Sequence, residues 1–287
     1  MTAVYRKELK SYFCGMTGAI FIGFVLLFTG IFTVVNNFKG YYPDFEYTVS
    51  AVSFIYLLVI PIITMRSVAE EKRAKTDKLL YSLPMSMGEI VCAKYFAMLT
   101  VLLIPTAVMS LYPLIMSSYG TVNFSTAYAM IFAFFLLGAT LISIGMFISS
   151  LTESQVIAAV ASLGVMILDY FMTGIANLIP MSAAASLAGV IGLIVVLGLI
   201  VNVMLKNQLI AICTSAILCG AAVLVYIFAP SILEGLIPNF LSSVSAFDKL
   251  TSFRSGIFDL TAVVYYLSVS ALFVFLTVQS MEKKRWN

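Results

Sequence analysis

Long apolar runs dominate this sequence and leave it few ways to fold. A bilayer core about 30 Å thick needs about 20 apolar residues in a helix. Because backbone polar groups in lipid must bond internally, such runs form helices. Eight runs have about this length: Gly18–Val35, Val49–Met65, Tyr95–Ser117, Ala127–Ser149, Gln155–Leu178, Ser186–Leu205, Leu209–Ala229 and Leu260–Ser280. The prediction is an all-helical, polytopic membrane protein with about eight transmembrane helices.

The composition agrees with a single membrane domain. The chain is 62% hydrophobic and 10% charged, whereas soluble globular domains carry about 25% charged residues. The gaps between the apolar runs are too short for a separate soluble domain, so residues 1–287 are expected to form one transmembrane domain.

Basic residues predict the orientation, because cytoplasmic loops carry an excess of Lys and Arg. With eight spans and a cytoplasmic N-terminus, thirteen basic residues lie in the cytoplasm: Arg6, Lys7, Lys10, Arg66, Lys72, Arg73, Lys75, Lys78, Lys94, Lys206, Lys283, Lys284 and Arg285. The other side has three, Lys39, Lys249 and Arg254. We therefore expect a multi-pass protein of the cell membrane, that of a bacterium, with both termini cytoplasmic. Its basic loops fit contact with anionic lipid and not with nucleic acid.

The longest polar interruption is the segment Arg66–Ala97. Its charged first part, which includes Glu70, Glu71 and Arg73, predicts an extension of the preceding helix. Glu71 and Lys75 stand at i and i+4 in the favourable order for an ion pair of about 0.2–0.5 kcal/mol. That energy is too small to explain the charge density, so some of these charges should face a partner.

A short amphipathic helix is expected next, because Thr76, Leu79, Leu80 and Leu83 stand at i, i+3, i+4 and i+7. Pro84 ends it, since the residue before proline avoids the α region. A new helix then begins with a capping box of Ser86 and Glu89, and Met85 and Ile90 are placed for a hydrophobic staple. A soluble helix with one apolar face needs a partner, which we expect to be another protein.

Two stretches resemble the permease subunits of type-2 ABC transporters, in the gliding-motility-type (GldF-like) branch. The first is R-x-x-A-E-E-K-R-x-x-T-x-x-L-L-x-x-L-P-x-S at residues 66–86, followed by Lys94 ahead of a span. The second is S-A-F-D-K-L-T-S-F-R-S-G-I-F-D-L-T-A-V-V-Y-Y-L-S at 245–268, followed by F-L-T-V-Q-S-M-E-K-K-R-W at 275–286. Together they cover roughly a third of the chain. Members of that branch commonly have six spans, so residues 186–229 resemble an added helical hairpin.

The resemblance implies that residues 66–97 form a cytoplasmic coupling loop that docks a separate ABC ATPase subunit. The residues expected to carry this contact are Glu70, Glu71, Arg73, Thr76, Leu79, Leu80, Leu83, Pro84, Ser86 and Glu89. The permease would work as a homodimer or heterodimer, with room for an accessory membrane or extracytoplasmic subunit.

The N-terminal residues 1–14 predict an amphipathic helix on the cytoplasmic membrane face. Its apolar residues are Tyr5, Leu9, Tyr12 and Phe13, opposite Arg6, Lys7 and Lys10. One interpretation is a membrane anchor. The other, implied by the resemblance, is a connecting helix that also touches the ATPase.

Two acidic residues elsewhere are candidates for function. Glu153 follows Thr152, which with Gln155 predicts a capping box and so places Glu153 in the first turn of a span. The resemblance makes it a possible second ATPase contact. Asp169 lies well inside a predicted span, where a carboxylate is costly and marks a functional site by default. It serves either a transport path or a structural hydrogen bond to a Ser or Tyr.

Residues 231–258 contain two apolar pieces that are too short to span. The first is interrupted by Pro238, and the second ends near Gly256. We expect an outer re-entrant or interfacial segment, with Phe240, Phe247 and Phe253 forming an outer lid.

Catalytic and metal-binding residues are not predicted. The chain has no histidine and no G-x-x-x-x-G-K-[ST] loop for ATP. ATP and Mg²⁺ would therefore be bound by the partner subunit, and the chain itself needs no cofactor. The favoured function is the transmembrane permease subunit of an ABC exporter. The alternatives are a proton-coupled secondary transporter that uses Asp169, and a membrane scaffold that transports nothing.

Overall fold

The structure, a computed structural model, consists of helices and turns, without a strand, in the residues that it describes. These are residues 1–40, 44–75, 85–192, 194, 216, 218–220, 223–224, 226–228 and 233–286. The all-helical architecture predicted from the sequence is confirmed.

Six helical stretches within the described part of the chain are long and apolar enough to cross a membrane. They are Thr17–Lys39, Phe45–Arg73, Met87–Met116, Phe124–Leu151, Gln155–Leu178 and Leu260–Lys283. Each overlaps one of the predicted apolar runs. The other two runs belong to the 186–229 hairpin, most of which lies outside the described residues, so the count of eight spans stays a prediction.

The chain divides into two compact units, one of Met1–Leu168 with Lys249–Asn287 and one of Asp169–Asp248. The first unit is a helix bundle. Its α-helices are α1 (Thr2–Cys14), α2 (Thr17–Phe32), α3 (Phe45–Val52), α4 (Tyr56–Thr64), α5 (Ala69–Arg73), α7 (Met87–Met109), α8 (Tyr112–Met116), α9 (Phe124–Leu151), the start of α10 (Gln155–Leu178), α15 (Leu250–Arg254) and α16 (Leu260–Trp286). A π-helix, Thr33–Lys39, continues α2, and the 3₁₀ turn Ser53–Ile55 joins α3 to α4.

The second unit contains the end of α10, an apolar helix at Ala183–Gly192 and α14 (Leu236–Val244). Gly189 packs against Ile237 so closely that a Cβ would lie 2.9 Å from its Cγ1. Pro238 was expected to interrupt a helix here, and that expectation is wrong. α14 begins at Leu236, so Pro238 lies in the first turn, where a backbone N–H has no partner within the helix.

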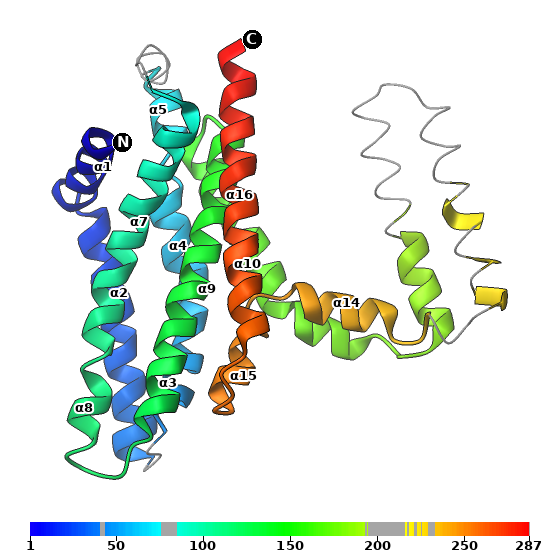
Figure 1. Ribbon diagram of the computed structural model, residues 1–287, viewed down its shortest axis with the longest axis horizontal. Coiled ribbons are helices and arrows are strands. Elements are labelled where there is room, and N and C mark those ends of the chain that lie inside the picture. The colour runs from blue at the N-terminus through cyan, green and yellow to red at the C-terminus, as the bar shows by residue number, and fades with distance from the viewer. Residues whose placement is uncertain are drawn as a thin grey trace. The chain divides into compact units, whose positions relative to one another are not determined.

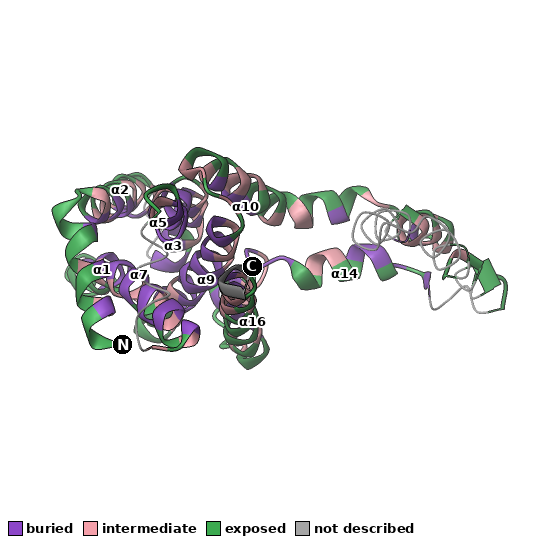
Figure 2. Ribbon diagram, turned by 90° about the horizontal axis from the view of Figure 1, so that it is seen from above, coloured by how far each residue is buried: buried purple, intermediate pink, exposed green. Residues whose placement is uncertain are grey.

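Helix α9 forms the centre of the first unit, since it packs against α3, α4, α7 and α16. Two glycines let its neighbours approach. A Cβ on Gly138 would lie 2.8 Å from Leu102 Cδ2, and a Cβ on Gly145 would lie 2.9 Å from Thr64 Cβ. In Figure 2 the buried positions of this unit gather on the inward sides of the helices, and the outer sides are exposed.

The two ends of the first unit differ in the elements that they bring together. Helix α1, α5, the start of α7 and the C-terminal end of α16 lie at one end (Figure 1). Helices α8 and α15 and the start of α3 lie at the opposite end. We call the first of these the loop end, because the segment Arg66–Ala97 leaves and re-enters the bundle there.

Replacing Gly145 with alanine should destabilise the protein, because the new methyl group would meet the rigid Thr64 side chain. Overpacking of this kind costs about 1–3 kcal/mol. The matched control is Gly23→Ala, which meets no atom within 4 Å and which helix propensity favours by about 1 kcal/mol. Thermal unfolding in detergent should rank Gly145→Ala below the wild type and Gly23→Ala at or above it. Equal unfolding temperatures for the two variants would contradict the close approach of α4 to α9.

Candidate functional site

The candidate coupling loop is described at both of its ends. The structure describes Arg66–Lys75 and Met85–Ala97, while the predicted contact residues Thr76, Leu79, Leu80, Leu83 and Pro84 lie outside the described residues. The short amphipathic helix therefore stays a prediction. The two described ends show how the loop is attached to the bundle.

The first end of the loop is a short charged helix. Helix α5 covers Ala69–Arg73 and has Glu70 and Glu71 in its first turn, where the helix dipole favours negative charge. Arg66 donates two hydrogen bonds to the Glu70 carboxylate, from Nε to Oε2 at 2.7 Å and from a terminal nitrogen to Oε1 at 3.0 Å. This two-pronged pair holds the turn that joins α4 to α5.

The same turn is fastened to the end of α9. The hydroxyl of the buried Ser149 accepts hydrogen bonds from the backbone N–H groups of Ala69 at 3.1 Å and Val68 at 3.4 Å. It also donates to the Met65 carbonyl at 3.3 Å. In addition, the buried Lys72 ammonium donates to the Ser150 carbonyl. Side chains thus satisfy backbone groups that the ends of α5 and α9 leave without helical partners.

The second end of the loop confirms the predicted start of a helix. Ser86 Oγ accepts from the Glu89 N–H at 3.3 Å, and the Glu89 carboxylate accepts from the Ser86 N–H at 3.4 Å. This is the capping box expected from the sequence, at the N-terminus of α7. Met85 packs against the buried pair Met87 and Ile90, as a hydrophobic staple does.

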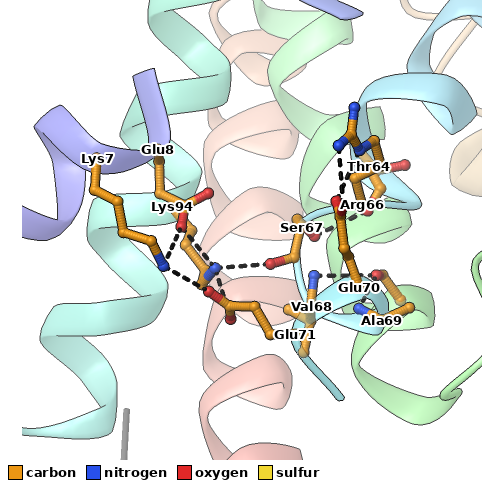
Figure 3. A network of polar contacts seen from close by, with 11 residues as sticks. Lys7, Glu8, Thr64, Arg66, Ser67, Val68, Ala69, Glu70, Glu71 and Lys94 are labelled. Atoms are coloured by element: carbon orange, nitrogen blue, oxygen red, sulfur yellow. Dashed lines mark hydrogen bonds and ion pairs between the residues drawn. The ribbon is translucent and has the colours of Figure 1, made fainter. Parts of the chain in front are cut away.

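A buried cation joins the two ends of the loop to the N-terminal helix. Lys94 on α7 is only 1% exposed. Its ammonium lies 3.0 Å from Glu8 Oε1, 2.9 Å from Glu71 Oε2 and 2.8 Å from the Ser67 carbonyl oxygen. Lys7 lies at the edge of this group, 3.3 Å from Glu71 Oε1. Figure 3 shows the arrangement, which we call the Lys94 cluster: Lys7, Glu8, Glu71 and Lys94 with the Ser67 carbonyl.

A polar cavity of about 140 Å³ borders the cluster. It is lined by Lys7, Glu8, Ser11, Tyr12, Thr17, Arg66, Ser67, Glu70, Glu71 and Lys94. Burial raises the pKa of the Tyr12 hydroxyl far above its ordinary value, and the nearby Glu8 carboxylate raises it further. Tyr12 therefore stays neutral throughout the physiological range and keeps its O–H as a donor.

Two sequence expectations at the loop end are corrected. Glu71 was expected to pair with Lys75, but α5 ends at Arg73, and Lys75 has a φ of 55° outside the helix. Glu71 pairs with Lys94 and Lys7 instead. The helix at residues 1–14 is confirmed as α1.

Helix α1 also packs on the protein, by a face that the sequence did not predict. That face consists of Val4, Glu8 and Tyr12, which are buried, whereas Phe13 is 44% exposed. This face includes a carboxylate because the Lys94 ammonium lies beside it.

Sequence reasoning missed Glu8 altogether and used Lys94 as a cytoplasmic charge and as part of the family pattern, without giving it a counter-ion. A signal for Lys94 was present: a lysine eight residues past the Ser86 cap, leading into an apolar run, requires a counter-ion once the helix is buried. Nothing local identifies Glu8 as that counter-ion, since it lies 86 residues away along the chain.

Glu153 is exposed in the turn between α9 and α10. It was expected in the first turn of a helix capped by Thr152. That placement is wrong, because α10 begins at Gln155, and the Thr152 hydroxyl donates to the Ser154 carbonyl at 3.4 Å. The exposed position of Glu153 leaves its carboxylate accessible to a partner.

Asp169 lies on α10 and contacts the chain after α14, within the second unit. Its Oδ1 accepts from the Ala246 N–H at 2.9 Å, and its backbone carbonyl accepts from the Ser245 hydroxyl at 3.2 Å. Within the described residues, the buried Oδ2 has no hydrogen-bond partner. The neighbouring Tyr170 ring packs edge-on against Phe247 with ring centroids 5.1 Å apart.

The three lid candidates have different surroundings. Phe240 on α14 is 53% exposed, whereas Phe247 and Phe253 are buried. Phe253 on α15 packs edge-on against Phe258. Gly256 then has a φ of 79°, a value that suits glycine and confirms that the second apolar piece ends near this residue.

A comparison with protein-family models decides the family. The model described as ABC-2 family transporter protein matches residues 34–185, more than half of the 287 residues. The chain belongs to the ABC-2 transporter family. Searches among curated proteins and among solved structures returned no match.

The ABC-2 permease is therefore a multi-pass membrane protein and a permease component of an ABC transporter. Permeases of this family are transport components, generally not catalytic themselves, and they work in general with an ABC ATPase. The matched range includes both ends of the loop and Ser149, whereas Glu8 lies before it.

Ser149→Ala in the permease should loosen the first end of the loop, because it removes the acceptor of two buried N–H groups. A loss of this kind costs about 1–3 kcal/mol. Ser150→Ala is the matched control, since the only bond of the buried Ser150 hydroxyl among the described residues is to the Phe147 carbonyl of its own helix. Limited trypsin digestion should cut after Lys72, Arg73 or Lys75 faster in Ser149→Ala than in the control. Equal rates would show that Ser149 does not hold the loop.

Asp169→Asn should leave the permease as stable as the wild type, because the amide oxygen can still accept from Ala246. Asp169→Leu removes that acceptor and should lower the free energy of unfolding by about 1–3 kcal/mol. Thermal unfolding in detergent measures both. A permease that carries protons on Asp169 would instead lose transport in the stable Asn variant, and this outcome would contradict a structural role.

Proposed function

We propose that this permease is the transmembrane subunit of an ABC exporter of the gliding-motility-type (GldF-like) branch. A separate ATPase subunit would dock on residues 66–97 and supply the energy. ATP and Mg²⁺ would bind to that subunit, since the chain has no P-loop sequence.

The attachment of the loop to the bundle is the observation that carries this proposal. The first end of the loop is bonded to α9 through Ser149 and Ser150, and to α1 and α7 through the Lys94 cluster. A displacement of the loop by a bound ATPase would therefore act on three helices at once. A loop that only connected two spans would need no such fastening.

The proposed mechanism is mechanical. ATP closes an ATPase dimer, the loops move with it, and the spans change between inward-facing and outward-facing states. The substrate path lies between two permease subunits, identical or different, with Asp169 along it and residues 231–258 as the outer lid. Glu153 supplies a second contact to the ATPase, which its exposed position supports.

The charge distribution supports a cytoplasmic location of both termini. The thirteen basic residues assigned to the cytoplasm include those of α1, of the loop and of the C-terminal end of α16, and these elements share the loop end of the first unit (Figure 1). The opposite end contains Lys39, Lys249 and Arg254. This orientation places the loop where a cytoplasmic ATPase reaches it.

Replacing Leu80 and Leu83 with aspartate tests the docking surface. Two carboxylates would enter a contact that excludes water, at a cost of several kcal/mol. We expect normal membrane insertion and loss of the ATPase from the purified complex. The matched control replaces the same two leucines with methionine, which keeps their volume and apolar character.

Quantitative co-purification, by the ATPase-to-permease ratio, measures the effect. We expect the methionine variant to retain the wild-type ratio. If the aspartate variant also keeps that ratio and transports normally, residues 66–97 do not form the ATPase contact, and this part of the proposal is wrong.

A further inference from the structure

The Lys94 cluster connects three separate elements through one ammonium group. The three oxygens around it belong to α1 (Glu8), to the turn after α4 (Ser67) and to α5 (Glu71), while Lys94 itself lies on α7. An ammonium group has three N–H donors, and three acceptors lie within 3.0 Å. Two hydrogen bonds, to Glu8 and to the Ser67 carbonyl, and an ion pair with Glu71 thus link Lys94 to elements distant in sequence.

Stability alone does not account for such a cluster. Charges removed from water lose hydration energy, and well-packed apolar residues often serve a fold equally well. What an ion cluster adds is direction, because ion pairs and hydrogen bonds hold their partners at set distances, whereas apolar contacts allow sliding. An ion cluster is therefore suited to linking two helices that must move together.

The position of the cluster in the molecule also supports a role in linking the movements of helices. Glu71 and Ser67 belong to the first end of the loop, which is also bonded to α9 through Ser149. Glu8 belongs to α1, which packs along α7. The family match begins at residue 34, so it says nothing of α1.

We propose that Lys94 is a positioning residue that makes α1 and α7 move with the coupling loop when the ATPase changes state. The proposal rests on the function proposed above. It assigns α1 a part in transmission and not only in anchoring. Glu71 was expected among the ATPase contacts, but its carboxylate is directed at Lys94 and Lys7 within the bundle. Removal of the cluster should therefore leave the ATPase bound but should weaken its control over the spans.

Two variants distinguish the cost of leaving buried carboxylates unpaired from the loss of the proposed transmission. Lys94→Met alone leaves Glu8 and Glu71 buried beside each other without the ammonium, so it should unfold at a lower temperature than the wild type. A triple variant, Lys94→Met with Glu8→Gln and Glu71→Gln, has no buried charge left in the cluster and should regain most of that stability. The triple variant is therefore the form in which function is measured.

The control variant breaks a buried polar link elsewhere in the same bundle. The hydroxyls of Thr140 on α9 and Ser270 on α16 lie 3.2 Å apart. Thr140→Val with Ser270→Ala removes this contact between two helices and leaves the loop end untouched. This control variant shows how the loss of a buried polar contact away from the cluster affects the response of the permease to ATP.

The readout is the response of the opposite end of the permease to ATP. Cys14, Cys92, Cys213 and Cys219 are replaced by serine, and Ile257, which is 63% exposed beside Gly256, becomes the single cysteine. The complex with its co-purified ATPase is placed in lipid nanodiscs and labelled with a maleimide, with and without ATP and vanadate. The ratio of the two labelling rates reports how far the ATPase controls the spans.

We expect the triple variant to keep the wild-type amount of ATPase while its labelling ratio falls by about 2- to 30-fold toward one, the range by which residues along a coupling route change the coupling. The Thr140 and Ser270 control should keep the wild-type ratio. A wild-type ratio in the triple variant would overturn the proposal, because the cluster would then serve the fold alone.

Two further outcomes also count against it. If the triple variant is no more stable than Lys94→Met, the three groups do not act as one charge cluster. If it loses the ATPase that the wild type retains, the cluster acts on docking and not on transmission. A wild-type permease that co-purifies with no ATPase would overturn the proposed function itself, and this proposal with it.

Discussion

The ion cluster around Lys94 is the interaction on which the loop end of this permease depends. An ammonium that is 1% exposed requires oxygen partners close by. Here they come from α1, from the turn after α4 and from α5. Because all three oxygens contact the same ammonium, the N-terminal helix and both ends of the candidate coupling loop lie together. The Arg66–Glu70 pair and the Ser149 hydroxyl then complete the attachment.

Helix α9 runs from the loop end of the first unit to its opposite end. It begins at Phe124 near the opposite end and finishes at Leu151, next to the residues that bond α5. Gly138 and Gly145 let α7 and α4 pack directly on it. Helix α16 follows it on another side, where Thr140 bonds the Tyr266 carbonyl. The first unit is therefore packed around α9.

Membership of the ABC-2 family gives this arrangement a use. Permeases of this family work in general with an ABC ATPase, and the function proposed here uses the loop fastened to three helices as the place where that ATPase acts. Asp169 belongs to a different part of the molecule, where it bonds the chain after α14. The hydrogen bond that its Oδ1 accepts from the Ala246 N–H holds two segments of the second unit together.

The sequence alone determined the helices, six apolar spans among the described residues, the cap at Ser86 and a charged helical segment after Arg66. Each depends on residues within a few positions of one another, because helical periodicity and capping act over about one turn. It also carried enough of the family pattern at residues 66–86 to indicate an ABC-2 permease.

Only the tertiary structure decided which charges meet. It chose Lys94 over Lys75 as the partner of Glu71, placed Glu8 on the buried face of α1, and gave Asp169 a backbone partner at Ala246. Glu8 and Lys94 are 86 residues apart and Asp169 and Ala246 are 77 apart. Their contacts depend on how whole helices pack, and no local pattern encodes that packing, because any buried lysine could be matched by several carboxylates until the helices are in place.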